Sequence, residues 1–246
     1  MNDTITKNII NVFEEVKELS FDVLINNLKK KQVDYYVQEK DDIRNIIVDL
    51  RNYNKSEKGD KYIILGAHYD IFPNSQGYND NISSVSLLLA FIDEAVKEAL
   101  NKDIVVVFFD KEESGMRGSN LFAKTFKDEI EYALIFDIVG FGDYIVSCNS
   151  HNNVDLKLDK YNILALNQRL PSDNVVFDMQ EIKNNLFVSL PEEDLIFLDD
   201  NKVTLNSNYT FYQSFHNGIY DNDIKLITWN TITIAYKFLK KKYIKD

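Results

Sequence analysis

Hydrophobic and polar positions follow helical and strand periods in turn along the first half of the chain. Apolar side chains recur at three-and-four spacing over residues 4–18 and 21–31, which predicts two helices. The segments VDYYVQ and IRNIIVDL then alternate or run apolar, as strands do. Farther on, KYIILGA, ISSVSLLLAFIDEAVKEAL and DIVVVFF have the patterns of a strand, a long helix and a strand. Residues 61–110 are therefore predicted to form a βαβ unit.

The same pattern continues to about residue 148 and then weakens. SNLFAKTFK predicts a short helix, and EYALIFDIVG and DYIVSC predict two further strands. Residues 149–208 are polar and rich in Asn and Asp, and there we expect helices near 158–169 and 191–198. A final helix is predicted over 222–242.

The order of these elements predicts an α/β fold. We expect one mixed, mainly parallel central β-sheet that is flanked by helices. No internal repeat, linker or sharp change of composition divides the sequence. Residues 1–246 are therefore expected to form a single domain.

Composition and charge exclude some classes of binding partner and indicate a cellular location. The chain has 246 residues, of which 45% are hydrophobic. Its net charge of −11 argues against nucleic acid or an acidic membrane surface as a partner. No segment reaches the ~18 apolar residues that a membrane span needs. The opening segment lacks the pattern of a secretory leader, and the lone Cys148 agrees with a reducing compartment. We therefore expect a cytoplasmic protein.

Polar side chains, most of them acidic, follow three of the predicted strands. They are His68 and Asp70 after the first strand, Glu112 and Glu113 after the second, and Asp137 after the third. Because parallel strands end along one edge of a sheet, these side chains are expected to meet there, together with Asp80 from the loop before the long helix. Each has an ordinary explanation by itself, such as a helix N-cap for Asp80. Together, however, several carboxylates beside an imidazole need a neutralising cation, which favours a metal site.

Five ordered segments carry a resemblance to a known family. LGAHYD, YNDNISSVSLLL, VVVFFDKEESGMRGS, ALIFDIVG and FHNGIYDN, spread over about 61–225, resemble the M28 family of zinc peptidases. The best-known members of that family are two-zinc aminopeptidases. The resemblance implies a fold of the zinc aminopeptidase, phosphorylase/hydrolase-like type.

The resemblance also implies a set of metal ligands. His68 and Asp137 resemble the ligands of one zinc, and Glu113 and His216 resemble those of a second. Asp80 resembles the carboxylate that bridges the two ions. Zinc accepts imidazole nitrogen and carboxylate oxygen, and two zinc ions ~3.5–4 Å apart can share one carboxylate and one water.

Two further roles and one backbone feature follow from the resemblance. Glu112 resembles the general base that takes a proton from water and passes it to the departing amine. Asp70 resembles the carboxylate that orients the imidazole of His68. The peptide bond from Asp80 to Asn81 is expected to be cis.

Some positions depart from the family pattern. Ser84 stands where the family often has Gly, and Phe215 stands where some members have a tyrosine that stabilises the oxyanion. The other candidates for that role are Tyr209, Tyr212 and Tyr220. His151 matches no motif, and we expect it to be a surface residue.

The expected activity is removal of N-terminal residues from peptides with a free N-terminus, with zinc as the cofactor and Glu112 as the base. One alternative is a single-zinc acyltransferase like glutaminyl cyclase, although the complete ligand set favours two zinc ions. The other is a non-catalytic binding protein that retains the fold, although an intact Glu112 argues against it.

Overall fold

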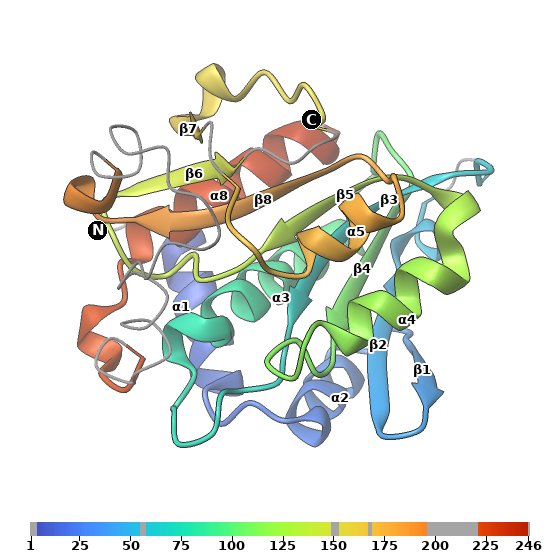
Figure 1. Cartoon of the computed structure of the whole chain (residues 1–246), viewed down its shortest axis with the longest axis horizontal. Helices are drawn as coiled ribbons and strands as arrows, with labels where there is room; N and C mark the ends of the chain where they lie inside the picture. The colour runs from blue at the N-terminus through green and yellow to red at the C-terminus, as the bar shows by residue number, and fades with distance from the viewer. Residues whose placement is uncertain (1–3, 55–57, 149–152, 167–168, 196–220, 246) are drawn as a thin grey trace.

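An eight-stranded mixed sheet forms the centre of the molecule (Figure 1). The computed structural model describes residues 4–54, 58–148, 153–166, 169–195 and 221–245. Within them the strand order is β1-β2-β4-β3-β5-β8-β6-β7. Neighbouring strands are parallel in the pairs β4–β3, β3–β5, β5–β8 and β6–β7 and antiparallel in the other three. The predicted α/β class and mixed, mainly parallel sheet are confirmed.

The strands follow the apolar runs of the sequence. Their bounds are β1 Tyr36–Lys40, β2 Ile43–Asp49, β3 Tyr62–His68, β4 Ile104–Phe109, β5 Ile130–Phe136, β6 Tyr144–Cys148, β7 Ile163–Leu166 and β8 Asn184–Leu190. Every residue of β3, β4 and β8 is buried. Strands that are covered on both faces lose the alternation of polar and apolar positions, which explains why β3 and β4 appear in the sequence as continuous apolar runs.

The helices cover both faces of the sheet. Their bounds are α1 Thr4–Val16, α2 Phe21–Lys30, α3 Ser84–Ala95, α4 Arg117–Phe126, α5 Asn174–Met179 and α8 Trp229–Tyr243. A π-helical turn, Tyr78–Ser83, precedes α3, and short 3₁₀ turns cover Leu50–Asn52, Lys127–Glu129, Leu158–Tyr161 and Ile224–Leu226. In Figure 1, α1, α3 and α8 lie on one face of the sheet and α4 and α5 on the other.

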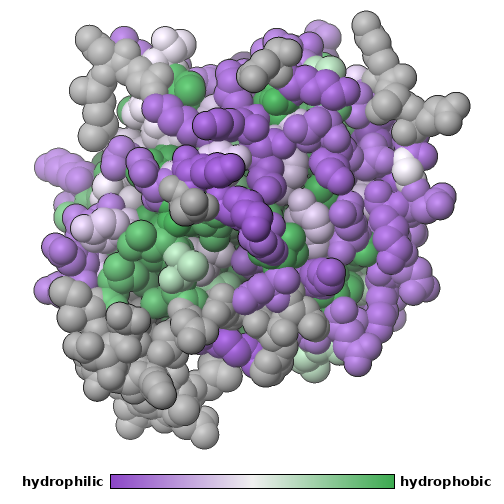
Figure 2. All heavy atoms as spheres, turned by 90° about the horizontal axis from the view of Figure 1, so that it is seen from above, coloured by the Kyte–Doolittle hydropathy of each residue, from purple (hydrophilic) through white to green (hydrophobic). Residues whose placement is uncertain are grey.

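Two hydrophobic cores result from this layering. Ile63 and Leu65 of β3 belong to the core beneath α1, α3 and α8. Ile64, between them, belongs to the core beneath α4 and α5. Successive side chains of a strand point to opposite faces of the sheet, so β3 contributes to both cores. Seen from above in Figure 2, hydrophilic side chains cover much of the outer surface between smaller hydrophobic patches.

The structure differs from the predictions mainly after residue 148. Strand β7 and a 3₁₀ turn replace the helix expected near 158–169, as far as that segment is described. Residues 192–195 are helical as expected, whereas 196–198 lie outside the described residues. Helix α5 and strand β8 were not predicted at all. Strand β8 is hidden in the sequence because Asn184 and Asn185 open it, and both are buried by tertiary contacts.

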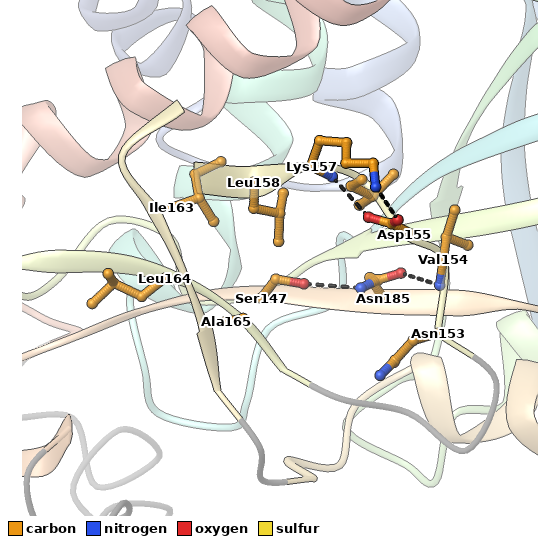
Figure 3. Close-up of a pocket in the computed structure, with 11 residues that line it drawn as sticks. Ser147, Asn153, Val154, Asp155, Lys157, Leu158, Ile163, Leu164, Ala165 and Asn185 are labelled. Atoms are coloured by element: carbon orange, nitrogen blue, oxygen red, sulfur yellow. Dashed lines mark hydrogen bonds and ion pairs between the residues drawn. The ribbon is translucent and has the colours of Figure 1, made fainter. Parts of the chain in front are cut away.

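A cavity of about 490 Å³ lies against β6, β7 and the segment 153–158 (Figure 3). At its wall the side-chain amide nitrogen of Asn185 donates to the Ser147 hydroxyl, and the side-chain oxygen of Asn185 accepts from the Val154 backbone N–H. Asn185 stands near the start of β8, whereas the predicted site residues follow the ends of strands parallel to β8. The cavity therefore lies away from the candidate site.

The close contact of Gly66 with its neighbours generates a prediction about stability. A Cβ atom at Gly66 would lie 2.5 Å from Cε2 of Phe109 and 3.0 Å from Cδ1 of Ile135, both fully buried. We expect Gly66→Ala to lower the free energy of unfolding by ~1–3 kcal/mol, the usual cost of overpacking a core. Urea denaturation measures this, with exposed Glu131→Ala as a control that changes stability by less than about 0.5 kcal/mol. An alanine variant as stable as the original protein would contradict this packing.

Candidate metal centre

The ends of three neighbouring parallel strands build the candidate site. Strand β3 lies between β4 and β5, with His68 paired to Phe109 and Gly66 paired to Ile135. His68 therefore ends β3 level with the end of β4, and Asp137 directly follows the end of β5. The expected meeting of these strand ends at one edge of the sheet is confirmed.

His68, Asp80 and Asp137 come together at this edge. The imidazole Nε2 of His68 lies 3.0 Å from Oδ1 of Asp80 and 3.4 Å from Oδ1 of Asp137. One ligand atom from each residue falls within 4.8 Å of the other two. His68 and Asp80 are buried, and Asp137 is largely so. One imidazole nitrogen and two carboxylate oxygens at this spacing suit a zinc ion.

The charges of this cluster act strongly on the imidazole. Burial lowers the pKa of His68, but the carboxylates of Asp137, Asp70 and Asp80 outweigh it and hold that pKa well above its usual value. Without a cation, a proton on His68 therefore compensates part of the negative charge. A bound metal ion would take over this role, because a histidine ligand must be deprotonated.

A turn with unusual backbone geometry carries Asp80. It belongs to the π-helical turn Tyr78–Ser83, inside which Asp80 and Asn81 leave helical geometry. The peptide bond between Asp80 and Asn81 is cis, as expected from the family resemblance. The Ser84 side chain, where the family often has Gly, is fully buried at the start of α3.

Asp70 contacts both the His68 imidazole and the backbone of Glu112 and Glu113. The Nδ1 atom of His68 lies 3.0 Å from the Asp70 backbone carbonyl and 3.6 Å from its carboxylate. The Asp70 carboxylate instead accepts hydrogen bonds from the backbone N–H groups of Glu112, at 2.9 Å, and Glu113, at 3.1 Å. The carbonyl is thus the nearer partner of the ring, and the carboxylate holds the segment with the two glutamates.

Glu112 and Glu113 lie in a turn that follows the end of β4. The Glu112 carbonyl accepts from the backbone N–H groups of Gly115 and Met116. Without a cation, burial raises the pKa of Glu112 to about 10 and that of Glu113 to about 8. Among charged neighbours, Asp80 contributes most to the raised pKa of Glu113. Glu113 is not part of the His68 cluster, but its carboxylate experiences the charge of Asp80.

Sequence reasoning missed one acidic residue near this site. Asp173 is fully buried just before α5. Burial raises its pKa to about 7, with a further increase from Asp137. Among charged neighbours, Asp173 contributes most to the raised pKa of Glu112. In the sequence it looks like an ordinary helix-capping residue in a polar stretch, and no local signal separates it from one.

Some predicted positions lie outside the described residues. They are His151, Tyr209, Tyr212, Phe215, His216 and Tyr220. Their predicted roles remain predictions, including that of His216 as a ligand of the second zinc.

An α/β sheet thus places a largely buried cluster of one imidazole and two carboxylates, groups that can bind zinc, at its strand ends. The model of peptidase family M28 matches residues 45–218, which is more than half of the chain. The chain therefore belongs to peptidase family M28.

Similar proteins agree with this family membership. A vacuolar membrane protease of Vanderwaltozyma polyspora is 29% identical over 99 residues, 40% of this chain and 10% of that protein. A putative endoplasmic reticulum metallopeptidase of Caenorhabditis elegans is 34% identical over 82 residues, 32% of this chain and 9% of that protein. The matched part thus spans about a tenth of these relatives.

Solved structures share the fold at low sequence identity. A zinc aminopeptidase from Bacillus subtilis has a TM-score of 0.63 and 19% identity, covering 82% of this chain and 50% of that one. A glutaminyl cyclase from Bacteroides thetaiotaomicron bound to N-acetylhistamine has a TM-score of 0.65 and 16% identity, covering 96% of this chain and 95% of that one. The predicted type of fold is confirmed.

The relatives contradict the expected cytoplasmic location. The names of the two matched proteins place them at the vacuolar membrane and in the endoplasmic reticulum. The expectation was wrong because it rested on the opening residues and on one cysteine, and neither feature determines the compartment of the folded domain. Among the described residues, no helix is both long and apolar enough to cross a membrane.

The raised carboxylate pKa values predict how the metal-free protein responds to pH. Glu112 and Glu113 have folded-state pKa values of about 10 and 8, above their ordinary value of 4.5. From pH 5 to 8 the folded state therefore binds more protons than the unfolded state. We expect the free energy of unfolding to fall as pH rises, by ~1.4 kcal/mol per pH unit for each extra proton.

Thermal unfolding at pH 6 and pH 8, with chelator and with saturating zinc, checks this dependence. Zinc is expected to flatten it, because the cation replaces the protons. Glu112→Gln should also flatten it in metal-free protein, because an amide does not titrate. Metal-free protein that is more stable at pH 8 than at pH 6 would contradict these pKa values.

Proposed function

We propose that this protein is a zinc-dependent aminopeptidase that removes N-terminal residues from peptides. The observation that carries the proposal is the buried cluster of His68, Asp80 and Asp137 at the sheet edge, with the raised-pKa Glu112 within its electrostatic reach. Membership of peptidase family M28 supports the hydrolase class. The zinc aminopeptidase from Bacillus subtilis supports the metal and the exopeptidase activity through its shared fold.

The proposed metal site holds two zinc ions. His68 and Asp137 would bind the first ion, and Glu113 and His216 the second. Asp80 would bind both ions, a role supported by its contact with His68 and its influence on the pKa of Glu113. The donor set consists of imidazole and carboxylate groups, which suit zinc.

The residues of this chain divide the proposed reaction between them. Zinc, when bound, supplies a Lewis acid that polarises the scissile carbonyl and lowers the pKa of water. The Glu112 carboxylate accepts a proton from the attacking water and transfers it to the nitrogen of the departing amine. The Asp70 carboxylate holds the backbone of Glu112 and Glu113 and so fixes the direction of the base. The acidic surroundings favour a substrate with a positively charged N-terminus.

The position of Asp80 favours a two-zinc aminopeptidase over a single-zinc cyclase. A cyclase-like transferase would use one zinc ion, and a solved glutaminyl cyclase shares the fold. Two zinc ions are favoured because Asp80 lies beside His68 and also raises the pKa of Glu113. An intact Glu112 favours catalysis over simple binding, because a protein that only binds has no need of a base.

Metal analysis tests the proposed zinc count. We expect the metal-free protein to bind two zinc ions per chain on reconstitution. Asp137→Asn should weaken binding of one ion by ~10-fold or more, because the amide lacks the ligand charge. Exposed Asp155→Asn, at the cavity that lies away from the candidate site, is the matched control and should bind like the original protein. One ion or fewer at saturating zinc would contradict the two-zinc site.

Hydrolysis of an aminoacyl chromophore tests the proposed activity and the base. Glu112→Gln should retain zinc but lose ~10²-fold or more in kcat, because the amide keeps the shape and loses the basic oxygen. Glu98→Gln, an exposed substitution of the same kind, should retain normal kcat.

Two substrate controls distinguish the alternatives. The N-acetylated form of the same chromophore should resist cleavage, since an aminopeptidase requires the free amine. Cyclisation of an N-terminal glutaminyl peptide without chromophore release would support the cyclase alternative and contradict the aminopeptidase. Normal kcat in Glu112→Gln with both ions bound would show that another residue is the base.

A further inference from the structure

Asp80 and Asp137 reach the same point from separate parts of the chain. Asp80 lies in the turn before α3, and Asp137 follows β5. Their carboxylates both lie within 3.4 Å of the His68 imidazole. One oxygen of each carboxylate lies within 4.8 Å of the other, and like charges this close repel one another strongly in a buried site. The surrounding structure must therefore hold both backbone segments in place before a cation arrives.

The Asn81 side chain holds the segment that carries Asp137. Its amide nitrogen donates to the Phe136 carbonyl at 3.1 Å, and its amide oxygen accepts from the Ile138 N–H at 3.2 Å. These partners are the residues immediately before and after Asp137. Asn81 is fully buried, so its two hydrogen bonds are shielded from competing water. One side chain next to Asp80 thus fixes the backbone on both sides of Asp137.

The backbone beside Asp137 shows the effect of this contact. Ile138 has a φ of 45°, in the left-handed region that a β-branched residue rarely adopts. Such a conformation persists only where the surrounding structure determines it. The Ile138 N–H is the donor to Asn81, and the Ile138 carbonyl accepts from the Ser189 hydroxyl. Both backbone polar groups of Ile138 therefore have tertiary partners that stabilise this conformation.

The Asp221 side chain holds the segment that carries Asp80. Its Oδ1 atom accepts from the backbone N–H groups of Asn79, at 2.7 Å, and Asp80, at 2.8 Å. Its Oδ2 atom accepts from the Ser75 hydroxyl. Asp221 is only 2% exposed and comes from a distant part of the sequence. A carboxylate that accepts two adjacent N–H groups fixes the direction of the peptide units that precede the Asp80 side chain.

We infer that Asn81 and Asp221 are positioning residues that set the Asp80–Asp137 pair in a zinc-ready arrangement. Together we call their side chains the aspartate brace. Neither residue belongs to the proposed ligand set, and each acts through the backbone of a proposed ligand. The inference rests on the proposed zinc site and adds the elements that preorganise it. Preorganised surroundings raise metal affinity because less rearrangement accompanies binding.

A series of variants at position 221 tests the brace. Asp221→Ala removes the acceptor, and we expect zinc binding weaker by ~10–100-fold, as is typical for residues that support metal ligands. Asp221→Asn keeps an oxygen that accepts both N–H groups, while its NH₂ group can donate to Ser75, so it should restore affinity to within about threefold. Asp223→Ala is the matched control. Asp223 is exposed and caps the turn Ile224–Leu226, and its removal should leave zinc affinity unchanged.

Zinc affinity is measured with Zn²⁺ alone, in competition with a chromophoric chelator. Asn81→Ala should weaken zinc binding to a similar extent through Asp137. If this core variant fails to fold, the comparison of Asp221→Ala with Asp221→Asn decides alone. A merely structural role would lower the unfolding temperature of Asp221→Ala without reducing the zinc affinity of the folded fraction, and that result would overturn the brace.

Amide hydrogen exchange in metal-free protein separates the brace from the proposed function. We expect exchange at the Asp80 amide to be about tenfold faster or more in Asp221→Ala, and likewise at Ile138 in Asn81→Ala, because each N–H loses its acceptor. Original protein that binds no zinc would contradict the proposed function, while these exchange rates would still report on the brace. Unchanged exchange and unchanged zinc affinity in both alanine variants would overturn the brace.

Discussion

Mutual repulsion among buried carboxylates is the constraint on which the rest of this structure depends. His68 lies among carboxylates that keep its pKa well above the usual value. Burial raises the pKa of Glu112, Glu113 and Asp173, and the negative charges of neighbouring carboxylates raise it further. Such a cluster is unfavourable by itself, and protons or cations must compensate it. The stability of the fold and the capacity to bind metal are therefore linked at one place.

The scaffold resists this repulsion through its sheet and through side chains that hold backbone. Strand β3 is hydrogen-bonded on both sides and buried on both faces, so the position of His68 is strongly determined. The Asp70 carboxylate holds the turn with the glutamates, and Asn81 and Asp221 hold the segments of Asp80 and Asp137. The side chains of Asp70, Asn81 and Asp221 thus form hydrogen bonds with backbone N–H or carbonyl groups. Hydrogen bonds of this kind are strong where water is excluded.

At this site the proposed metal ligands are different residues from the proposed general base. Asp80 and Asp137 contact His68 directly, whereas Glu112 lies in a separate turn. The negative charge of Asp173 raises the pKa of that glutamate. A base that is close to the metal ligands but not one of them can change protonation without loss of a ligand. This division of roles agrees with a hydrolase of peptidase family M28.

The sequence by itself determined the central strands and the major helices, and it predicted that His68, Asp80 and Asp137 meet at one edge of the sheet. Apolar runs specify β3, β4 and β5 because these strands are buried on both faces, and polar residues directly after a run mark the ends of the strands. Only the tertiary structure decided the rest. Strand β8 opens with polar residues, and Asp173 resembles an ordinary cap, so burial rather than local pattern gives each its place. The contacts of Asn81 and Asp221 join distant segments, and a local sequence pattern carries no information about which distant backbone groups a side chain will meet.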